Sequence, residues 1–128
     1  MLKEIKTDAA PKPLSNYAQA IETPAGARMV FIAGQVGADP SSGMIPENPE
    51  EQHRLAWANV LGILKAAGMD QRNIVDARVF ITDRSQVALY RQVRDEVLKG
   101  HKAAATLLVV AGLADPRLVI EVTVIAAA

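Results

Sequence analysis

Two strongly apolar segments near the end of the chain, residues 106–110 and 118–125, constrain its fold more than any other feature. Both are rich in β-branched residues, and a turn-forming stretch, 112–116, separates them, so both are predicted to be β-strands. Their apolar side chains occupy successive as well as alternate positions, so they point to both faces of a sheet. Both faces of that sheet must therefore be covered.

The spacing of apolar residues predicts two helices and three further strands before these segments. Asn48 is suited to the N-cap of the first helix, Pro49 to its first position and Gly68 to a left-handed cap at its end. The predicted elements, in order, are a β-hairpin over 17–22 and 28–35, a helix from Pro49 to Gly68, a strand over 74–82 and a second amphipathic helix from Val87 to Gly100.

The predicted order β-β-α-β-α-β-β describes a single α+β domain that spans residues 1–128. Two helices can cover one face of a five-stranded sheet but not both faces. The second apolar face would exceed the exposed patch that a monomer tolerates. We therefore expect a homo-oligomer that buries this face between subunits.

Composition excludes several classes of function. Fourteen basic and fourteen acidic residues give zero net charge, which disfavours nucleic acid and anionic membranes as partners. The chain has no cysteine for a thiolate metal site or a thiol nucleophile, and the spacing of its two histidines predicts no metal site. Charges near the N-terminus and the absence of a long apolar run are typical of a cytoplasmic protein without a membrane span.

Glu121 is the most informative candidate residue, because it lies in the middle of a predicted apolar strand. An unpaired carboxylate there would cost several kcal/mol or would take up a proton. One interpretation places the carboxylate in water, at the sheet edge or at the rim of an oligomer. The other, which we weigh equally, places it in a cleft where it transfers protons or orients a water molecule.

The other candidates are weaker on the residues alone. Tyr17 precedes a predicted strand, where a tyrosine is more often a packing residue with its hydroxyl at the surface. Gly34 ends a strand and suits either a ligand contact or a bulge. The basic tract from Arg84 to Lys102 is typical of the solvated face of a helix, and within it Lys102 is a candidate contact for an anion. The sequence contains neither a phosphate loop nor a nucleophile elbow.

Short segments spread over nearly the whole chain carry a resemblance to a known family. They are LSNYAQA at 14–20, FIAGQV at 31–36, DPSSG at 39–43, EQ at 51–52, NVL at 59–61, AAG at 66–68, FITD at 80–83 and VIE at 119–121. In number and order, these segments resemble those of the Rid family, the reactive intermediate deaminases that are also called YjgF proteins.

The resemblance implies a chorismate-mutase-like α+β fold assembled as a homotrimer, with clefts between subunits that hold a small-molecule ligand. It also implies hydrolysis of reactive enamines or imines to a keto acid and ammonia, with no metal or organic cofactor. By position, Glu121 is similar to the family's active-site glutamate, and Tyr17 is similar to its cleft tyrosine. The resemblance implies that both are catalytic residues, with Glu121 acting on the water or the departing ammonia and the Tyr17 hydroxyl directed toward the substrate. The backbone near Gly34 and Leu107 is similar to positions that contact a bound ligand.

The chain also departs from the family pattern. Deaminating members have Pro-Ala-Arg-Ser where residues 103–106 are AAAT, so the arginine that holds the substrate carboxylate is replaced by Ala105. The family's serine before Gly-Gln is Ala33 here, and its helix asparagine is Arg91. The lost contact matters because an arginine–carboxylate pair is usually bidentate and strong.

Three functions remain open from the sequence. The first is a divergent deaminase or hydrolase whose substrate lacks a carboxylate or pairs it with Lys102 or Arg91. The second is a trimeric protein that binds a small metabolite without turnover. The third, endoribonuclease activity, is disfavoured by zero net charge and by few aromatic side chains for base stacking.

Overall fold

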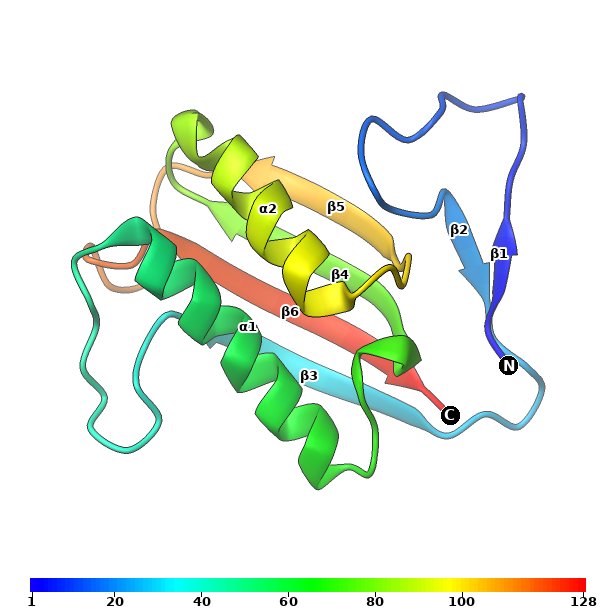
Figure 1. The fold of residues 1–128 in the computed structure, drawn as a ribbon, viewed down its shortest axis with the longest axis horizontal. Helices are drawn as coiled ribbons and strands as arrows, with labels where there is room; N and C mark the ends of the chain where they lie inside the picture. The colour runs from blue at the N-terminus through cyan, green and yellow to red at the C-terminus, as the bar shows by residue number, and fades with distance from the viewer.

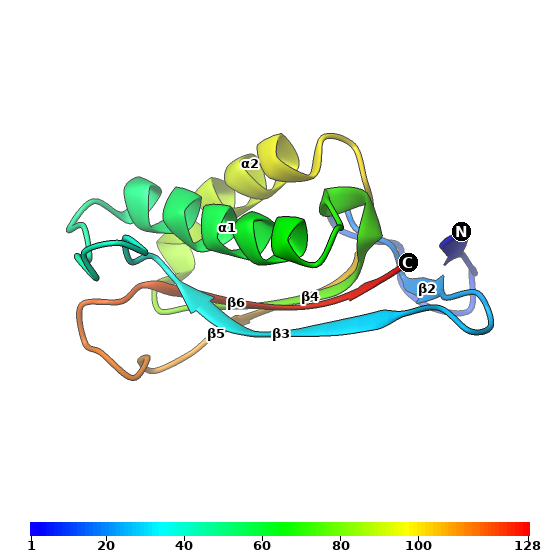
Figure 2. The same ribbon diagram turned by 90° about the horizontal axis from the view of Figure 1, so that it is seen from below.

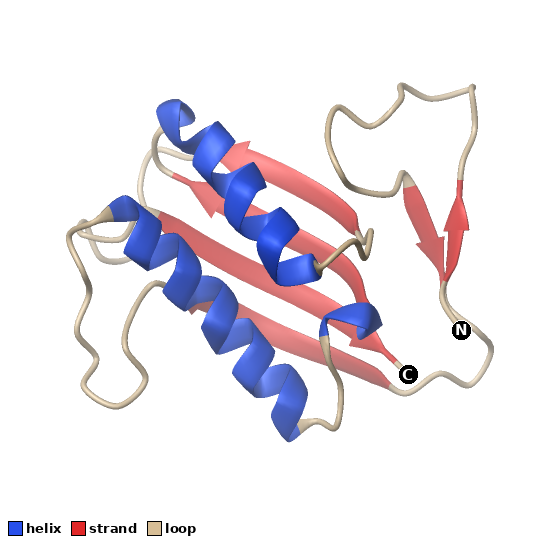
Figure 3. Ribbon diagram, viewed as in Figure 1, coloured by secondary structure: helices blue, strands red, loops and turns tan.

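The computed structural model describes all residues from 1 to 128, with two helices on one face of a β-sheet (Figures 1 and 2). In chain order the elements are β1 (Lys3–Ile5), β2 (Ala20–Glu22), β3 (Met29–Val36), α1 (Pro49–Ala66), β4 (Ile74–Ile81), α2 (Val87–Leu98), β5 (Ala104–Val109) and β6 (Ile120–Ala127). Short 3-10 turns, η1 (Gln71–Asn73) and η2 (Arg84–Gln86), precede β4 and α2. The predicted α+β class and both predicted helices are confirmed (Figure 3).

The main sheet has four strands in the order β3-β6-β4-β5. β6 is antiparallel to both β3 and β4, whereas β5 pairs with β4 in parallel. The last strand of the chain is therefore inserted between β3 and β4 (Figure 1). The expected five-stranded sheet is wrong in number, because β1 and β2 form a separate two-stranded ribbon.

The predicted hairpin between residues 17–22 and 28–35 is also wrong. Ala18 donates its backbone N–H to the Ala103 carbonyl over 2.9 Å and forms an isolated parallel bridge with Ala104. These contacts hold the N-terminal segment at the free edge of β5, whereas β3 is the opposite edge strand of the sheet. β2 therefore pairs with β1, and the loop after β2 leads to β3 (Figure 1).

The first helix begins and ends where the sequence predicts. Asn48 Oδ1 accepts a hydrogen bond from the Glu51 backbone N–H over 3.1 Å, and Pro49 is the first helical residue. The helix ends at Ala66, and Gly68 adopts a φ of 72°, a left-handed conformation that glycine takes without steric cost. No helix in the structure has both the length and the apolar character needed to cross a bilayer.

The core lies between the helices and the side of the sheet that faces them. Trp57 and Leu64 of α1 and Tyr90 of α2 are buried against Val79 of β4 and Val122 of β6. Burial of each large apolar side chain stabilises the fold by about 1.5–3 kcal/mol. The sheet is thus covered on one face by its own chain.

The other face, which we call the open face, is covered by no helix (Figure 2). Strand register places on it, among others, Phe31, Phe80, Leu108, Glu121 and Ile125. Phe31 is 73% exposed and Leu108 is 48% exposed, which is unusual for large apolar side chains on a monomer. The uncovered second face expected from the sequence is present, but it is only partly apolar, because Arg78 lies on it between Thr106 and Thr123 and pairs with Asp76 over 3.1 Å.

A buried glutamine anchors the loops at one end of the sheet. Gln52 of α1 donates to the carbonyls of Pro46 and Arg117 over 2.9 and 2.8 Å, and its Oε1 accepts from the Val119 N–H over 2.9 Å. A Cβ atom at Gly37 would lie 2.5 Å from the Gln52 backbone, so only glycine fits there. The loops that follow β3 and precede β6 are thereby held against α1.

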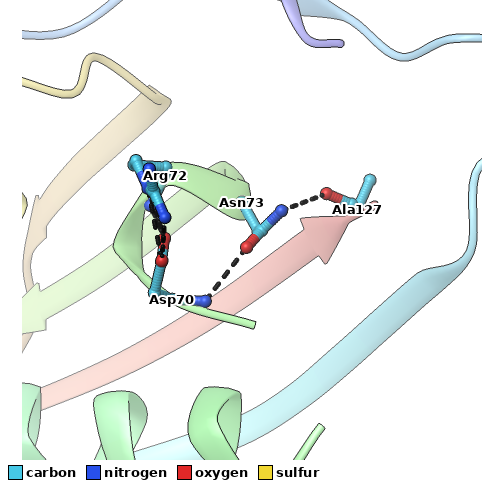
Figure 4. Close-up of polar contacts among 4 residues, drawn as sticks. All are labelled: Asp70, Arg72, Asn73 and Ala127. Atoms are coloured by element: carbon cyan, nitrogen blue, oxygen red, sulfur yellow. Dashed lines mark hydrogen bonds and ion pairs between the residues drawn. The ribbon is translucent and has the colours of Figure 1, made fainter. Parts of the chain in front are cut away.

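The other end of β6 is tied to the start of β4 (Figure 4). Asn73 Oδ1 accepts from the Asp70 N–H over 3.0 Å, and its Nδ2 donates to the Ala127 carbonyl over 3.1 Å. Hydrogen bonds from Arg72 hold the pKa of Asp70 at about 2. Fixing both ends of β6 sets the register that places Glu121 opposite Phe80.

Candidate functional site

Glu121 lies on the open face against the backbone of Gly34. In β6 it is in register with Val36 of β3 and Phe80 of β4, and it is half-buried. A methyl group at Gly34 would overlap the Glu121 carboxylate, so the close approach requires glycine. The carboxylate forms no hydrogen bond or ion pair within the chain. It is therefore free to interact with a water molecule or a ligand.

A β-bulge produces this close approach. The β3–β6 register shifts between Ile32, which pairs with Val124, and Gln35, which pairs with Val122. Two residues of β3, Ala33 and Gly34, therefore stand opposite one residue of β6. Of the two roles that the sequence suggests for Gly34, the bulge is present in the structure, and it lies beside the Glu121 carboxylate.

A second group of candidates lines a groove between α2 and β5, which we call the α2–β5 groove. It has a volume of about 390 Å³, and the N-terminal segment forms one of its walls. Tyr17 lies on that wall, Arg91 on α2, and Ala105 and Leu107 on β5. The Tyr17 hydroxyl accepts a hydrogen bond from the Leu14 N–H over 3.3 Å, which fixes the ring at the groove.

Lys102 lies outside this groove. It lines a different hollow of about 590 Å³, together with Lys6 and Lys12. Tyr17 borders both hollows, so it separates Lys102 from the position of Ala105. Of the two cations considered from the sequence, only Arg91 shares a groove with Ala105 and Leu107.

The two groups lie on opposite faces of the sheet. Ala105 and Leu107 are in parallel register with Ala77 and Val79, whose side chains are buried on the helix-facing side. Glu121 is in register with Phe80, which follows Val79 and so points the other way. The structure therefore brings Glu121 and Gly34 together, and separately Tyr17, Arg91, Ala105 and Leu107, but it does not unite the two groups within one chain.

Arg94 is a groove residue that the sequence reasoning assigned wrongly to a solvated face. It is 2% exposed, its Nη1 donates to Ser15 Oγ over 3.1 Å, and its Nε donates to Asp95 Oδ1 over 3.0 Å. Its Cζ lies 5.3 Å from the centre of the Tyr90 ring, a cation–π contact. Burial raises the pKa of the Tyr90 hydroxyl. Arg94 thus holds the N-terminal wall of the groove against α2.

Both histidines have structural partners. His53 is buried in α1 with its Nε2 3.0 Å from Gln86 Oε1, and burial lowers its pKa below the usual value of 6.5. His101 Nε2 lies 2.7 Å from the Ile74 carbonyl. No group of three or more His, Asp or Glu side chains converges where it could hold a metal ion.

Comparison with known proteins gives consistent matches over most of the chain. A family model described as Endoribonuclease L-PSP matches residues 7–128. A 2-iminobutanoate/2-iminopropanoate deaminase from Mus musculus is 35% identical over 112 residues, which are 87% of this chain and 81% of that protein. A RutC family protein from Aquifex aeolicus is 35% identical over 98 residues, which are 77% of this chain and 76% of that protein. The crystal structure of Escherichia coli TdcF with bound serine aligns with a TM-score of 0.73 at 32% identity and covers 97% of both chains.

Proposed function

The chain belongs to the Rid (YjgF) family, whose model is described as endoribonuclease L-PSP, and from that premise we propose that it hydrolyses reactive imines or enamines in clefts between its subunits. The observation that carries this proposal is the unpaired carboxylate of Glu121, which lies against the Gly34 bulge on the open face. A relative with more than a third of its aligned residues identical carries the name of a 2-iminobutanoate/2-iminopropanoate deaminase.

In the proposed hydrolysis, Glu121 is the catalytic residue that transfers protons. The oxygen of a water molecule bonds to the C=N carbon, and the carboxylate carries two protons in turn from that oxygen to the nitrogen. The C–N bond then breaks with its electron pair on nitrogen, which leaves as ammonia, and the oxygen becomes the carbonyl of the product. No atom is oxidised or reduced, so the reaction needs neither an oxidant nor a reductant.

The opposite placement of the two residue groups supports a site built by two chains. Tyr17, Ala105 and Leu107 cannot reach a substrate that also touches Glu121 of the same chain, because the sheet separates them. A ring of three chains that packs each open face against a neighbour's α2–β5 edge would bring the two groups together. The same packing would cover Phe31 and Leu108, which are exposed in the single chain. We therefore propose a homotrimer with three equivalent clefts.

One alternative function has a specific observation in its favour. The groove contains Ala105 at the position for which the resemblance implies an arginine, which favours a protein that binds a small metabolite without converting it. The endoribonuclease activity in the family description has weaker support here, since the net charge is zero and aromatic residues are few.

Turnover of an imine generated in the assay tests the proposal. An amino-acid oxidase acting on leucine supplies 2-imino-4-methylpentanoate, and semicarbazide trapping reports how much imine survives with and without the protein. We expect faster loss of the imine with the wild-type protein, and a rate lower by about 100- to 10,000-fold for Glu121→Gln. Glu47→Gln, an exposed loop glutamate, is the matched control and should keep full activity.

Two outcomes would contradict the proposal. If Glu121→Gln is as fast as wild type, the carboxylate has no part in proton transfer. If the wild-type protein accelerates hydrolysis of no imine in a series that includes alkyl and aromatic side chains, the binding-protein alternative replaces the deaminase.

A further inference from the structure

We infer that the α2–β5 groove binds a carboxylate ligand with a bulky apolar side chain and that Arg84 and Arg91 hold its carboxylate. This inference rests on the proposed function, because it names the class of imine that the cleft would take. It differs from the sequence expectation in adding Arg84, in excluding Lys102 and in assigning a size to the ligand.

The ionisable side chains that line the groove include three arginines and no carboxylate. Arg84 and Arg91 are exposed, and neither forms an ion pair or a side-chain hydrogen bond within the chain. Arg94 is buried, and its Nε and Nη1 donate to Asp95 Oδ1 and Ser15 Oγ, which fixes it in the wall of the groove. Two unpaired guanidinium groups at one groove are suited to bidentate binding of a carboxylate.

The spacing of these residues places both arginines on one side of the groove. Arg84, Val87 and Arg91 follow each other at intervals of three and four residues, so their side chains lie on the same face as η2 continues into α2. All three line the groove. A carboxylate held between Arg84 and Arg91 would therefore lie next to Val87.

The rest of the lining is apolar. Leu107 and Val109 of β5 lie across the groove from Val87, and Val109 is 45% exposed. Seven of the eleven lining residues are hydrophobic, so a ligand's hydrocarbon part gains more here than a polar group would. A bound apolar side chain would cover surface that is now exposed to water.

Ala105 makes room for such a side chain. Its side chain is a single methyl group, so it takes up little of the space beside β5. The volume of about 390 Å³ lies within the range of roughly 300–1,000 Å³ that is usual for small-molecule sites and exceeds what a three-carbon acid fills. The geometry thus favours imines of branched or aromatic 2-oxo acids over 2-iminopropanoate.

Equilibrium titration with stable 2-oxo acids tests the inference without turnover. The probes are 4-methyl-2-oxopentanoate, pyruvate and 4-methyl-2-pentanone, which has the branched chain but no carboxylate. We expect 4-methyl-2-oxopentanoate to bind about tenfold or more tightly than pyruvate, because its extra carbons are buried, and we expect no measurable binding of the ketone. The double variant Arg84→Gln/Arg91→Gln should lose tenfold or more in affinity.

Lys65→Gln/Lys99→Gln is the control for the loss of two positive charges, since both lysines are exposed and lie outside the groove. Equal affinity for pyruvate and 4-methyl-2-oxopentanoate, or equal affinity of the two double variants, would overturn the inference. Turnover of the imine series separates the two proposals. If an imine is hydrolysed but the bulky acid is not bound preferentially, the deaminase stands and the inference is wrong. If the bulky acid is bound preferentially but no imine is hydrolysed, the deaminase is wrong and the ligand preference of the groove stands.

Discussion

Replacing Phe31 by aspartate is expected to dissociate the proposed trimer while leaving the chain folded. Phe31 lies on the open face in register with Ile125 and is 73% exposed. Full burial of such a side chain contributes about 1.5–3 kcal/mol, so covering its exposed part contributes about 1–2 kcal/mol per chain. Its loss should cost the isolated fold little, because water already surrounds most of the ring.

Symmetry multiplies this contribution. Over three chains, Phe31→Asp reduces the favourable free energy of trimer assembly by about 3–6 kcal/mol in total, and the aspartate adds the cost of burying a charge. For a trimer, the protein concentration at half-dissociation follows the square root of the dissociation constant. That concentration should therefore rise at least about tenfold, and about a hundredfold or more at the upper end.

Sedimentation equilibrium over a dilution series measures this shift, and circular dichroism melting checks that Phe31→Asp remains folded. Met44→Asp is the matched control, because Met44 is 71% exposed but lies in the loop before α1. If the wild-type chain has the mass of a monomer at every concentration, the trimer is wrong. If both variants dissociate alike, the open face is not the interface.

Four further substitutions test other parts of the structure. Gly34→Ala should keep the fold but displace the Glu121 carboxylate and lower turnover, whereas Gly62→Ala, an open helical position, should raise the free energy of unfolding by up to about 1 kcal/mol in a denaturant titration. Gly37→Ala should lower that free energy by about 1–3 kcal/mol, because its Cβ would lie 2.5 Å from the α1 backbone. Hydrogen bonds from the hydroxyls and N–H groups of Ser41 and Ser42 hold the pKa of Asp39 at about 2, below its usual 3.8. The stability that this carboxylate contributes is therefore complete above pH 4 and is lost as the pH falls towards 2. Asp39→Asn should reduce the fall in Tm over that range, and an unchanged fall would contradict this.

The elements with strong local signals were predictable from the sequence. Asn48, Pro49 and Gly68 mark the ends of α1 through capping chemistry that acts within a few residues. The uncovered second face was predictable because apolar residues occupy successive positions in the last two strands and so point to both faces of the sheet. The hairpin failed because strand pairing is decided by distant contacts, here the bond from Ala18 to Ala103 at the β5 edge.

The candidate site was predictable residue by residue but not as an arrangement. Glu121 and Gly34 were both identified, yet their contact depends on a bulge that no local pattern announces. Arg94 was missed because its charge suggested a solvated position. Its spacing from Val87 and Tyr90, seven and four residues, places it on the buried stripe of α2, and this signal outweighs residue type.

The separation of the two residue groups by the sheet has a genetic consequence. In a ring of three chains, each cleft would take Glu121 from one chain and Tyr17 from the next. Two defective alleles, one with Glu121→Gln and one with Tyr17→Phe, would then complement each other when co-expressed, because random assembly restores both native side chains to roughly a quarter of the clefts. Two alleles altered on the same face, such as Glu121→Gln and Gly34→Ala, would restore none.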